Sequence, residues 1–150
     1  MKNLLPCYPD CYVCGISNKK GFNQKFFYDA ELKTVYTYFK ADITFAGYKD
    51  IVHGGVFLTL LDEVMAWVCI CESKNPCLTL KMDTRFIKKA KCNIEYRISG
   101  KVDKIKGKML FASSNVIDSS GCIYYESKGV YVKEDDEDFI GSLHGPRLPI

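Results

Sequence analysis

The sequence is poor in histidine, tryptophan and proline, and these shortages exclude several classes of protein. Only two histidines, His53 and His144, occur in 150 residues, so a zinc site with three histidines cannot form within one chain. With one tryptophan, five prolines and 47% hydrophobic residues, the composition is that of a folded domain and not of a fibrous or disordered protein. The net charge of +3 is too small to indicate nucleic-acid binding. A chain of this length predicts one domain with its own core.

No stretch of the chain has the pattern of a secretory signal or a membrane span. The start, MKNLLPCYPD, has no long apolar run followed by a small-residue cleavage site. The longest apolar stretch, residues 54–71, contains Asp62 and Glu63 near its middle, which disfavours a membrane-spanning helix. We therefore expect the eight cysteines to be free thiols in a reducing compartment. The protein is expected to be cytoplasmic and not bound to a membrane.

Hydrophobic patterning predicts a long antiparallel sheet and one buried helix. Apolar and polar residues alternate along residues 78–86 and 93–102, which is typical of a half-buried antiparallel sheet. In the first of these strands, the alternation places Thr79 on the face opposite Phe86. The segment 54–72 is apolar on every side, as expected of a buried helix. The sequence thus predicts an α+β fold in which the sheet wraps around a single central helix.

The same pattern divides the chain into three parts. Strand candidates occur at residues 26–28 and 35–39, and four more strands are expected within residues 78–132. We predict an irregular cysteine-containing lead-in over residues 1–24, one folded domain over residues 25–132, and an acidic, loosely ordered tail over residues 133–150.

The start of the predicted helix has the features of an oxyanion site. Gly54 and Gly55 leave the first backbone N–H groups unobstructed, and these groups have no partners within the helix. The helix dipole adds partial positive charge at this end. Such an end can bind an anion or the oxygen of a carbonyl under attack. The alternative is that the glycines only allow close packing or form a helix cap.

Two carboxylates in the middle of the helix are the second candidate feature. Burial of Asp62 or Glu63 costs free energy unless the group is paired or has a task, and burial raises its pKa toward the range of a general base. The alternative is that one or both reach the surface or pair with Lys or Arg of the sheet. Gly54 and Asp62 lie about 12 Å apart along the helix, too far to act on one carbonyl. We therefore expect a two-fold dimer whose sites combine Gly54 of one chain with Asp62 of the other.

Basic residues outnumber acidic residues between Thr79 and Lys108. This surplus suits a phosphorylated ligand, but lysines also protect a solvated outer strand face from edge pairing. Both interpretations stay open for the individual residues.

Three cysteines of the lead-in, Cys7, Cys11 and Cys14, have the spacing C-x3-C-x2-C. A zinc knuckle needs four ligands, usually as two matched pairs, and only one pair here has the spacing. With no histidine nearby, the sequence predicts no metal site.

The motifs together resemble one enzyme family. The run Ile51-Val52-His53-Gly54-Gly55, followed by Leu60-Leu61-Asp62-Glu63, resembles hotdog-fold acyl-CoA thioesterases of the phenylacetic-acid-degradation (PaaI-like) type, in the 4-hydroxybenzoyl-CoA thioesterase superfamily. Cys11-Tyr12-Val13-Cys14-Gly15 is similar to that family's C-x-x-C-G signature, and Thr79 with Arg85-Phe86 to its T…RF strand. The resemblance covers residues 11–132. It implies the hotdog fold and self-association as a dimer or a dimer of dimers.

The resemblance also implies an activity, the hydrolysis of an acyl-CoA thioester to free acid and CoA. Gly54, helped by Gly55, would supply the oxyanion amide, and Asp62 would be the general base or nucleophile. Thr79 would orient the attacking water, and no cofactor, metal or nucleic acid is expected. Gly47 stands where many members have Asn or Gln, so a non-catalytic acyl-CoA-binding protein and a hotdog enoyl-CoA hydratase remain alternatives.

The expected substrate-binding residues lie around these groups. His53 would fix the helix entry, basic residues after the strand would bind the CoA phosphates, and an apolar or aromatic acyl group would contact Phe57, Trp67 and other apolar side chains. The complete predicted set is His53, Gly47, Tyr48, Met65, Arg85, Phe86, Lys88 and Lys89.

Overall fold

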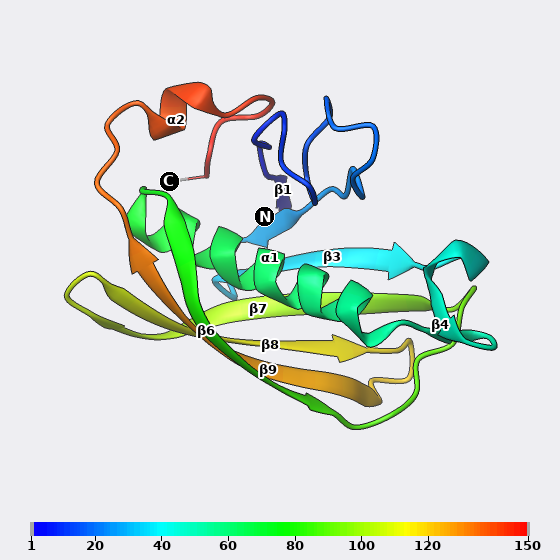
Figure 1. Ribbon diagram of the computed structural model, residues 1–150. Coiled ribbons are helices and arrows are strands. Elements are labelled where there is room, and N and C mark those ends of the chain that lie inside the picture. Colours follow the sequence, from blue (N-terminus) through cyan, green and yellow to red (C-terminus); the bar gives the residue numbers. More distant parts are fainter. Residues whose placement is uncertain (1, 150) are drawn as a thin grey trace.

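The chain folds as a curved antiparallel sheet that wraps around one long helix, α1 (Gly54–Ser73), in a computed structural model that describes residues 2–149 (Figure 1). The strand order is β1-β2-β3-β7-β8-β9-β6. This architecture confirms the predicted α+β fold, with a helix that begins at the predicted residue. The strands are β1 (Lys2–Leu4), β2 (Phe27–Asp29), β3 (Thr34–Lys40), β6 (Cys77–Phe86), β7 (Glu95–Lys106), β8 (Met109–Ile117) and β9 (Ile123–Lys133).

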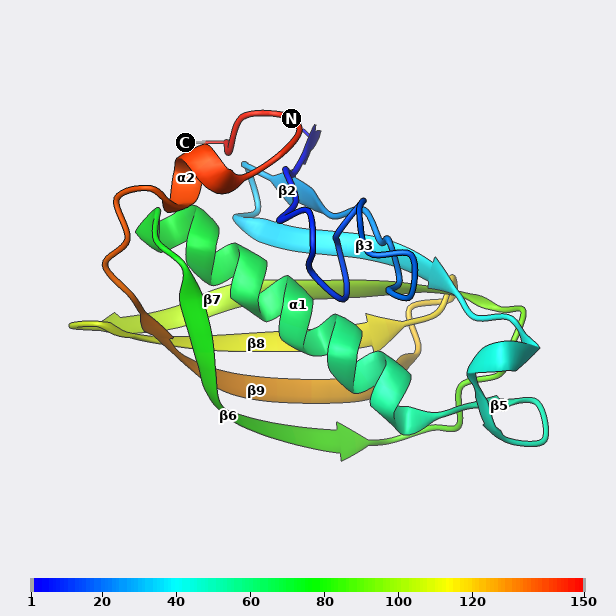
Figure 2. The same ribbon diagram turned by 45° about the horizontal axis from the view of Figure 1, so that its top comes forward.

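Helix α1 forms the centre of the core. Leu60, Leu61 and Val64 have no exposed surface, because the sheet covers one side of the helix and the lead-in covers the other (Figure 2). The helix is long and apolar enough to cross a membrane, but this cover shows that its hydrophobicity serves the core. It ends at Lys74, whose left-handed backbone (φ 61°) lets its N–H bond to the Ile70 carbonyl.

A small hairpin leads into α1. The 3₁₀ helix η1 (Ile43–Phe45) is followed by strands β4 (Ala46–Tyr48) and β5 (Ile51–Val52), which pair antiparallel with an irregular register. The sequence pattern does not predict these elements, because each is only two or three residues long. The hairpin brings Gly47 back against His53, where α1 begins.

Strand β6 lies at an edge of the sheet and contains a bulge that changes which side chains face α1. Its register with β9 shifts between Thr79 and Lys81. A bulge inserts one extra residue and so re-aims the side chains on one side of it. Thr79 therefore faces α1, as Phe86 does, whereas strict alternation wrongly placed the two on opposite faces. Leu78 and Leu80 are 54% and 57% exposed along this edge.

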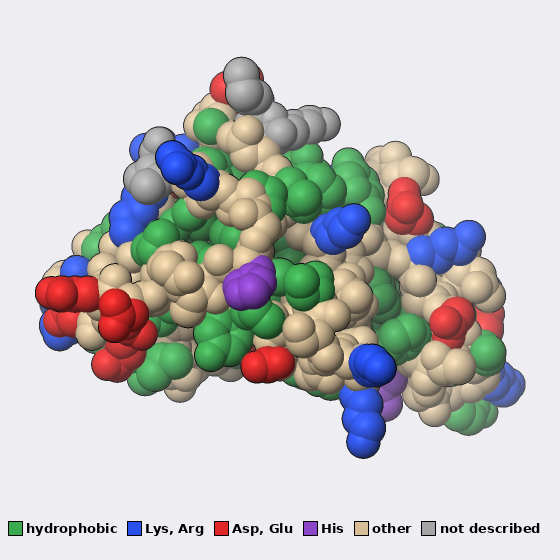
Figure 3. Space-filling view, turned by 90° about the horizontal axis from the view of Figure 1, so that it is seen from above, with side chains coloured by type: hydrophobic (Ala, Val, Ile, Leu, Met, Phe, Trp, Pro, Cys, Tyr) green, Lys and Arg blue, Asp and Glu red, His purple; other side chains and the backbone are tan. Residues whose placement is uncertain are grey.

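The two ends of the chain pack together over α1 (Figure 2). Cys7 and His144 exchange two backbone hydrogen bonds of 2.8 Å, and Leu148 is buried in the core cluster. The tail, which includes helix α2 (Phe139–Ser142), is therefore anchored and not the loose appendage that its acidic composition predicts. Residues 134–138 are all exposed, and acidic side chains gather at that end of the molecule (Figure 3). The lead-in is likewise partly regular, because β1 pairs with β2.

Candidate active site

Asp62 lies in the middle of α1, where two hydroxyl groups hold its carboxylate. The Thr79 hydroxyl of β6 donates a hydrogen bond to Oδ1 over 2.8 Å, and the Tyr131 hydroxyl of β9 donates to the same oxygen over 2.7 Å. Thr79 and Tyr131 are register partners, so two strands present both hydroxyls to one point of the helix. Within residues 2–149, Oδ2 has no hydrogen-bond partner. That oxygen is available to a water molecule or a substrate.

Tyr131 is a site residue that the sequence pattern does not reveal. Its side chain is fully buried, and burial together with the nearby charge of Asp62 raises its pKa. The phenol therefore stays protonated and acts as a donor. In the sequence, Tyr131 is one more apolar position in a strand, and only its pairing with Thr79 reveals the second hydroxyl.

At the start of α1, His53 acts as the helix cap. Its Nδ1 accepts the N–H of Gly55 over 3.0 Å, and its carbonyl accepts the N–H of Val56 over 3.0 Å. The Gly55 amide is thus occupied, which removes it from the oxyanion role that the resemblance implies. The N–H of Gly54 has no acceptor in the described part of the chain. It remains as the donor available to a carbonyl oxygen.

Phe86, at the end of β6, packs over Gly54. A Cβ placed on Gly54 would lie 2.6 Å from Cε1 of Phe86, so the glycine allows this close approach. The boundary between α1 and β6, which we call the α1–β6 seam, therefore has Gly54 and Phe86 at one end and Asp62 and Thr79 at the other. Eight helical residues separate the two ends, a distance of about 12 Å.

Gly47 also lies near the helix start. A Cβ on this glycine would be 3.2 Å from Cα and Cδ2 of His53, so the Asn or Gln of many relatives would require a local shift of the hairpin. Tyr48 is 69% exposed, and the Lys49 ammonium lies 5.4 Å from the centre of its ring.

The predicted acyl-binding residues do not line an open pocket. Met65 and Phe57 are fully buried in the core, and Trp67 is 3% exposed. The apolar pattern that places these residues on the central helix also explains why they do not line a pocket. A helix enclosed by a sheet and a lead-in has few faces that a ligand can reach. The prediction of an apolar or aromatic acyl group therefore loses this support.

The predicted phosphate-binding residues are dispersed. Arg85 alternates with Phe86 and so projects from the outer face of the sheet, where its guanidinium lies 3.8 Å from the Glu126 carboxylate beside a depression of about 780 Å³. Lys88 and Lys89 are exposed beyond β6, and the Lys88 ammonium lies 2.7 Å from the Cys122 sulfur. Arg85 is thus on the wrong face to reach a ligand at Gly54 of the same chain.

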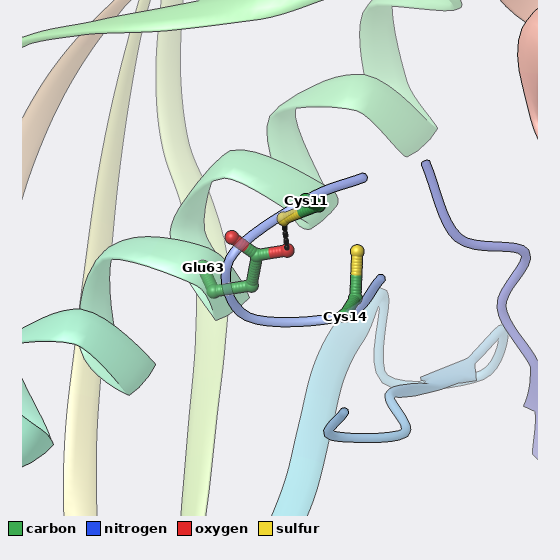
Figure 4. Close-up of side chains that lie close together, drawn as sticks. All are labelled: Cys11, Cys14 and Glu63. Carbon is green, nitrogen blue, oxygen red and sulfur yellow. Dashed lines mark hydrogen bonds between the residues drawn. The ribbon is translucent and has the colours of Figure 1, made fainter. Parts of the chain in front are cut away.

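Glu63 points away from the seam, toward the lead-in (Figure 4). Its Oε1 accepts the Trp67 indole N–H over 3.0 Å and the Cys11 thiol over 3.6 Å. Burial raises the pKa of Glu63 to about 8, and a hydrogen bond from Cys14 lowers the pKa of Cys11 to about 5. Within residues 2–149, neither Asp62 nor Glu63 forms an ion pair with Lys or Arg.

The sequence is similar to one known family and to one curated protein. Residues 49–122 match the model of the thioesterase superfamily. The chain is 30% identical over 105 residues to an uncharacterized protein of Schizosaccharomyces pombe, an alignment that covers 69% of this chain and 60% of that protein. The chain therefore spans about 60% of the length of this curated relative.

Solved structures share the fold at low sequence identity. A thioesterase superfamily protein aligns with a TM-score of 0.74 and 20% identity, over 83% of this chain and 61% of that one. The Escherichia coli PaaI protein of the phenylacetic acid degradation operon aligns with a TM-score of 0.65 and 10% identity, over 69% and 74%. A Streptococcus mutans protein solved with acetyl-CoA aligns with a TM-score of 0.64 and 14% identity, over 69% and 83%. The sheet wrapped around α1 is thus the hotdog fold, and residues 49–122 within it match the thioesterase superfamily.

Proposed function

We propose that the protein hydrolyses an acyl-CoA thioester to the free acid and CoA. The superfamily domain and the similarity to a protein solved with acetyl-CoA support this reaction class. The observation that carries the proposal is the α1–β6 seam. There the Asp62 carboxylate is held by two hydroxyls with one oxygen free, and the unpaired N–H of Gly54 lies at the other end of the seam.

In the proposed reaction, the Gly54 N–H donates a hydrogen bond to the thioester carbonyl oxygen and stabilises the negative charge of the tetrahedral intermediate. Asp62 either takes a proton from the water that attacks the carbonyl carbon, or attacks that carbon itself to form an anhydride that water then hydrolyses. The carbon–sulfur bond breaks, and CoA leaves as a thiolate that takes up a proton. His53 is occupied as a cap, which disfavours the histidine-based hydratase alternative.

The proposed site needs two copies of the chain, because Gly54 and Asp62 of one copy are about 12 Å apart. The β6 edge offers the pairing surface, since no strand of residues 2–149 covers it and it exposes Leu78 and Leu80. Antiparallel pairing of two β6 strands around a two-fold axis near Met82 places Thr79 opposite Phe86 of the partner subunit. Asp62 then faces Gly54 of the partner subunit, which completes the site.

The test of the proposed function is a panel of acyl-CoA esters that includes short, long and aromatic acyl groups. Hydrolysis should be followed by the loss of thioester absorbance, because a thiol-specific dye would also react with the eight free cysteines. We expect turnover of at least one class of ester. Tight binding of every ester without turnover, or hydration of an enoyl-CoA in place of hydrolysis, would contradict the proposal.

Replacing Thr79 with valine should lower kcat. Valine has nearly the same shape but cannot donate to Asp62, and a hydrogen bond to a charged group contributes about 1.5–3 kcal/mol. We therefore expect a decrease of about 10- to 100-fold in kcat at saturating acyl-CoA. Thr79→Ser keeps the hydroxyl and is the matched control. Equal activity of the valine and serine variants would show that this hydroxyl has no part in the reaction.

The shared site predicts that two inactive variants rescue each other. A heterodimer of one Asp62→Asn chain and one Gly54→Pro chain has one site with both substitutions and one site with neither. Purified through two different affinity tags, this heterodimer should show about half of the wild-type activity. Each variant alone should be inactive. A folded heterodimer without activity would mean that each site is built from a single chain.

A further inference from the structure

A second cluster of reactive side chains lies on the side of α1 that faces the lead-in (Figure 4). The sulfur atoms of Cys11 and Cys14 and a carboxylate oxygen of Glu63 all lie within 4.8 Å of one another. Cys14 is 4% exposed, whereas Cys11 and Glu63 are half-buried. The proposed hydrolysis uses none of these three groups, although Glu63 is the direct neighbour of Asp62.

The lead-in is folded so that it presents both sulfurs to the helix. Its turn is closed by the N–H of Gly15, which bonds to the Cys11 carbonyl over 3.0 Å. A Cβ on Gly15 would lie 2.4 Å from that carbonyl oxygen, so this turn requires glycine. The N–H of Val13 donates to the Cys11 sulfur over 3.3 Å, a contact that favours the thiolate form of a cysteine.

We propose that Cys11, Cys14 and Glu63 bind one zinc ion, with a water molecule as the fourth ligand. Zinc takes thiolate sulfur at about 2.3 Å and carboxylate oxygen at about 2.0–2.2 Å in tetrahedral geometry, which separates sulfur from oxygen by about 3.5 Å and the two sulfurs by about 3.8 Å. The Cys11 sulfur and Oε1 of Glu63 are already 3.6 Å apart. The other two separations are at most 4.8 Å.

The third ligand distinguishes this site from the metal-free lead-in that the sequence predicts. The spacing of residues along the sequence reveals only one pair of cysteines as candidate ligands. The fold brings Glu63 close to this pair as a third ligand. The Trp67 indole N–H donates to Oε1 over 3.0 Å and so orients the carboxylate, as outer-shell groups do in metal sites. Two thiolates select zinc over magnesium or calcium.

A disulfide between Cys11 and Cys14 is the competing use of these thiols, and it explains less of the cluster. It would consume the Cys11 sulfur that lies 3.6 Å from Glu63 and leave the carboxylate with the Trp67 indole as its remaining partner. No lysine or arginine of residues 2–149 pairs with Glu63. A divalent cation would take both cysteines as thiolates and Glu63 as a carboxylate, and so would use all three groups at once.

The test is titration of the untagged full-length protein, purified with a non-chelating reductant, with Co²⁺ and then Zn²⁺. We expect one Co²⁺ per chain, thiolate-to-cobalt charge-transfer absorption, ligand-field bands of tetrahedral coordination, and loss of both signals when Zn²⁺ displaces the cobalt. Cys14→Ser should weaken binding at least about 10-fold and reduce the charge-transfer band, and Glu63→Gln should weaken binding while keeping that band. Cys7→Ser, in the same lead-in but outside the cluster, should bind as the wild type does.

Zinc X-ray absorption on the wild-type protein keeps the test decisive if a variant fails to fold. The expected first shell has two sulfur and two oxygen ligands. The proposal is overturned if the wild type does not bind Co²⁺ with this stoichiometry, if the shell lacks two sulfurs, or if Glu63→Gln binds as tightly as the wild type. A Cys11–Cys14 disulfide that persists in protein purified with the reductant would also overturn it.

Discussion

Asp62→Asn is expected to lower kcat for thioester hydrolysis by at least about 100-fold, because general acid–base catalysis contributes about 10²–10⁴. Asparagine keeps the size of the side chain, and its carbonyl oxygen can still accept hydrogen bonds from Thr79 and Tyr131, which now meet Oδ1. The fold and the proposed self-association should therefore survive. What is lost is the group that takes the proton or attacks the carbonyl.

The measurement is steady-state hydrolysis of the best ester of the panel, with circular dichroism and size-exclusion chromatography on the same samples. Asp83→Asn is the matched control, because Asp83 is exposed and pairs with Lys128 across the strands on the outer face of the sheet. This variant should keep wild-type turnover. Retained turnover in a folded Asp62→Asn protein would exclude Asp62 as base or nucleophile.

Gly54→Pro is expected to cause a loss of comparable size, about 10²–10³ in kcat, by removing a single oxyanion donor. Proline has no N–H but suits the first position of a helix, and Gly54 is that position. The preceding His53 has φ −59° and ψ 130°, the extended conformation that a residue before proline prefers. Because the Gly54 N–H has no acceptor in residues 2–149, no hydrogen bond of the fold is lost.

Gly54→Ala is the control for this variant. Alanine adds a Cβ that meets the Phe86 ring, as proline does, but it keeps the N–H. A decrease in kcat that is common to both variants measures the effect of displacing Phe86. The additional decrease in the proline variant measures the contribution of the Gly54 N–H. If the two variants lose activity equally, the Gly54 amide does not stabilise the oxyanion.

The central helix and the presence of the main strands follow directly from the sequence pattern. The all-round apolar segment 54–72 matches α1 almost residue for residue, because a helix enclosed by a sheet must be apolar on every side. The alternation in residues 93–102 likewise overlaps β7, in which Tyr96 and Ile98 are buried. These features depend on the periodicity of apolar residues, which can be recognised in a single sequence.

The parts of the site that the sequence does not reveal depend on strand pairing and on contacts across the fold. Tyr131 is a site residue only because it pairs in register with Thr79. The orientation of Thr79 depends in turn on a bulge that no residue type in the sequence predicts. Glu63 lies in sequence beside Asp62 but turns toward Cys11, fifty-two residues away. Side-chain direction along a helix and a shifted strand are set by the assembled core, which local patterning does not contain.

The extra residue in β6 also affects how the sequences of related proteins should be interpreted. Side chains alternate with a period of two along a strand, so a relative lacking the counterpart of Leu80 would keep the threonine in its sequence yet turn it toward solvent. An alignment would count that threonine as conserved. The separation between Thr79 and Met82 is therefore a better guide to whether the hydrogen bond to Asp62 is kept than the identity of the threonine.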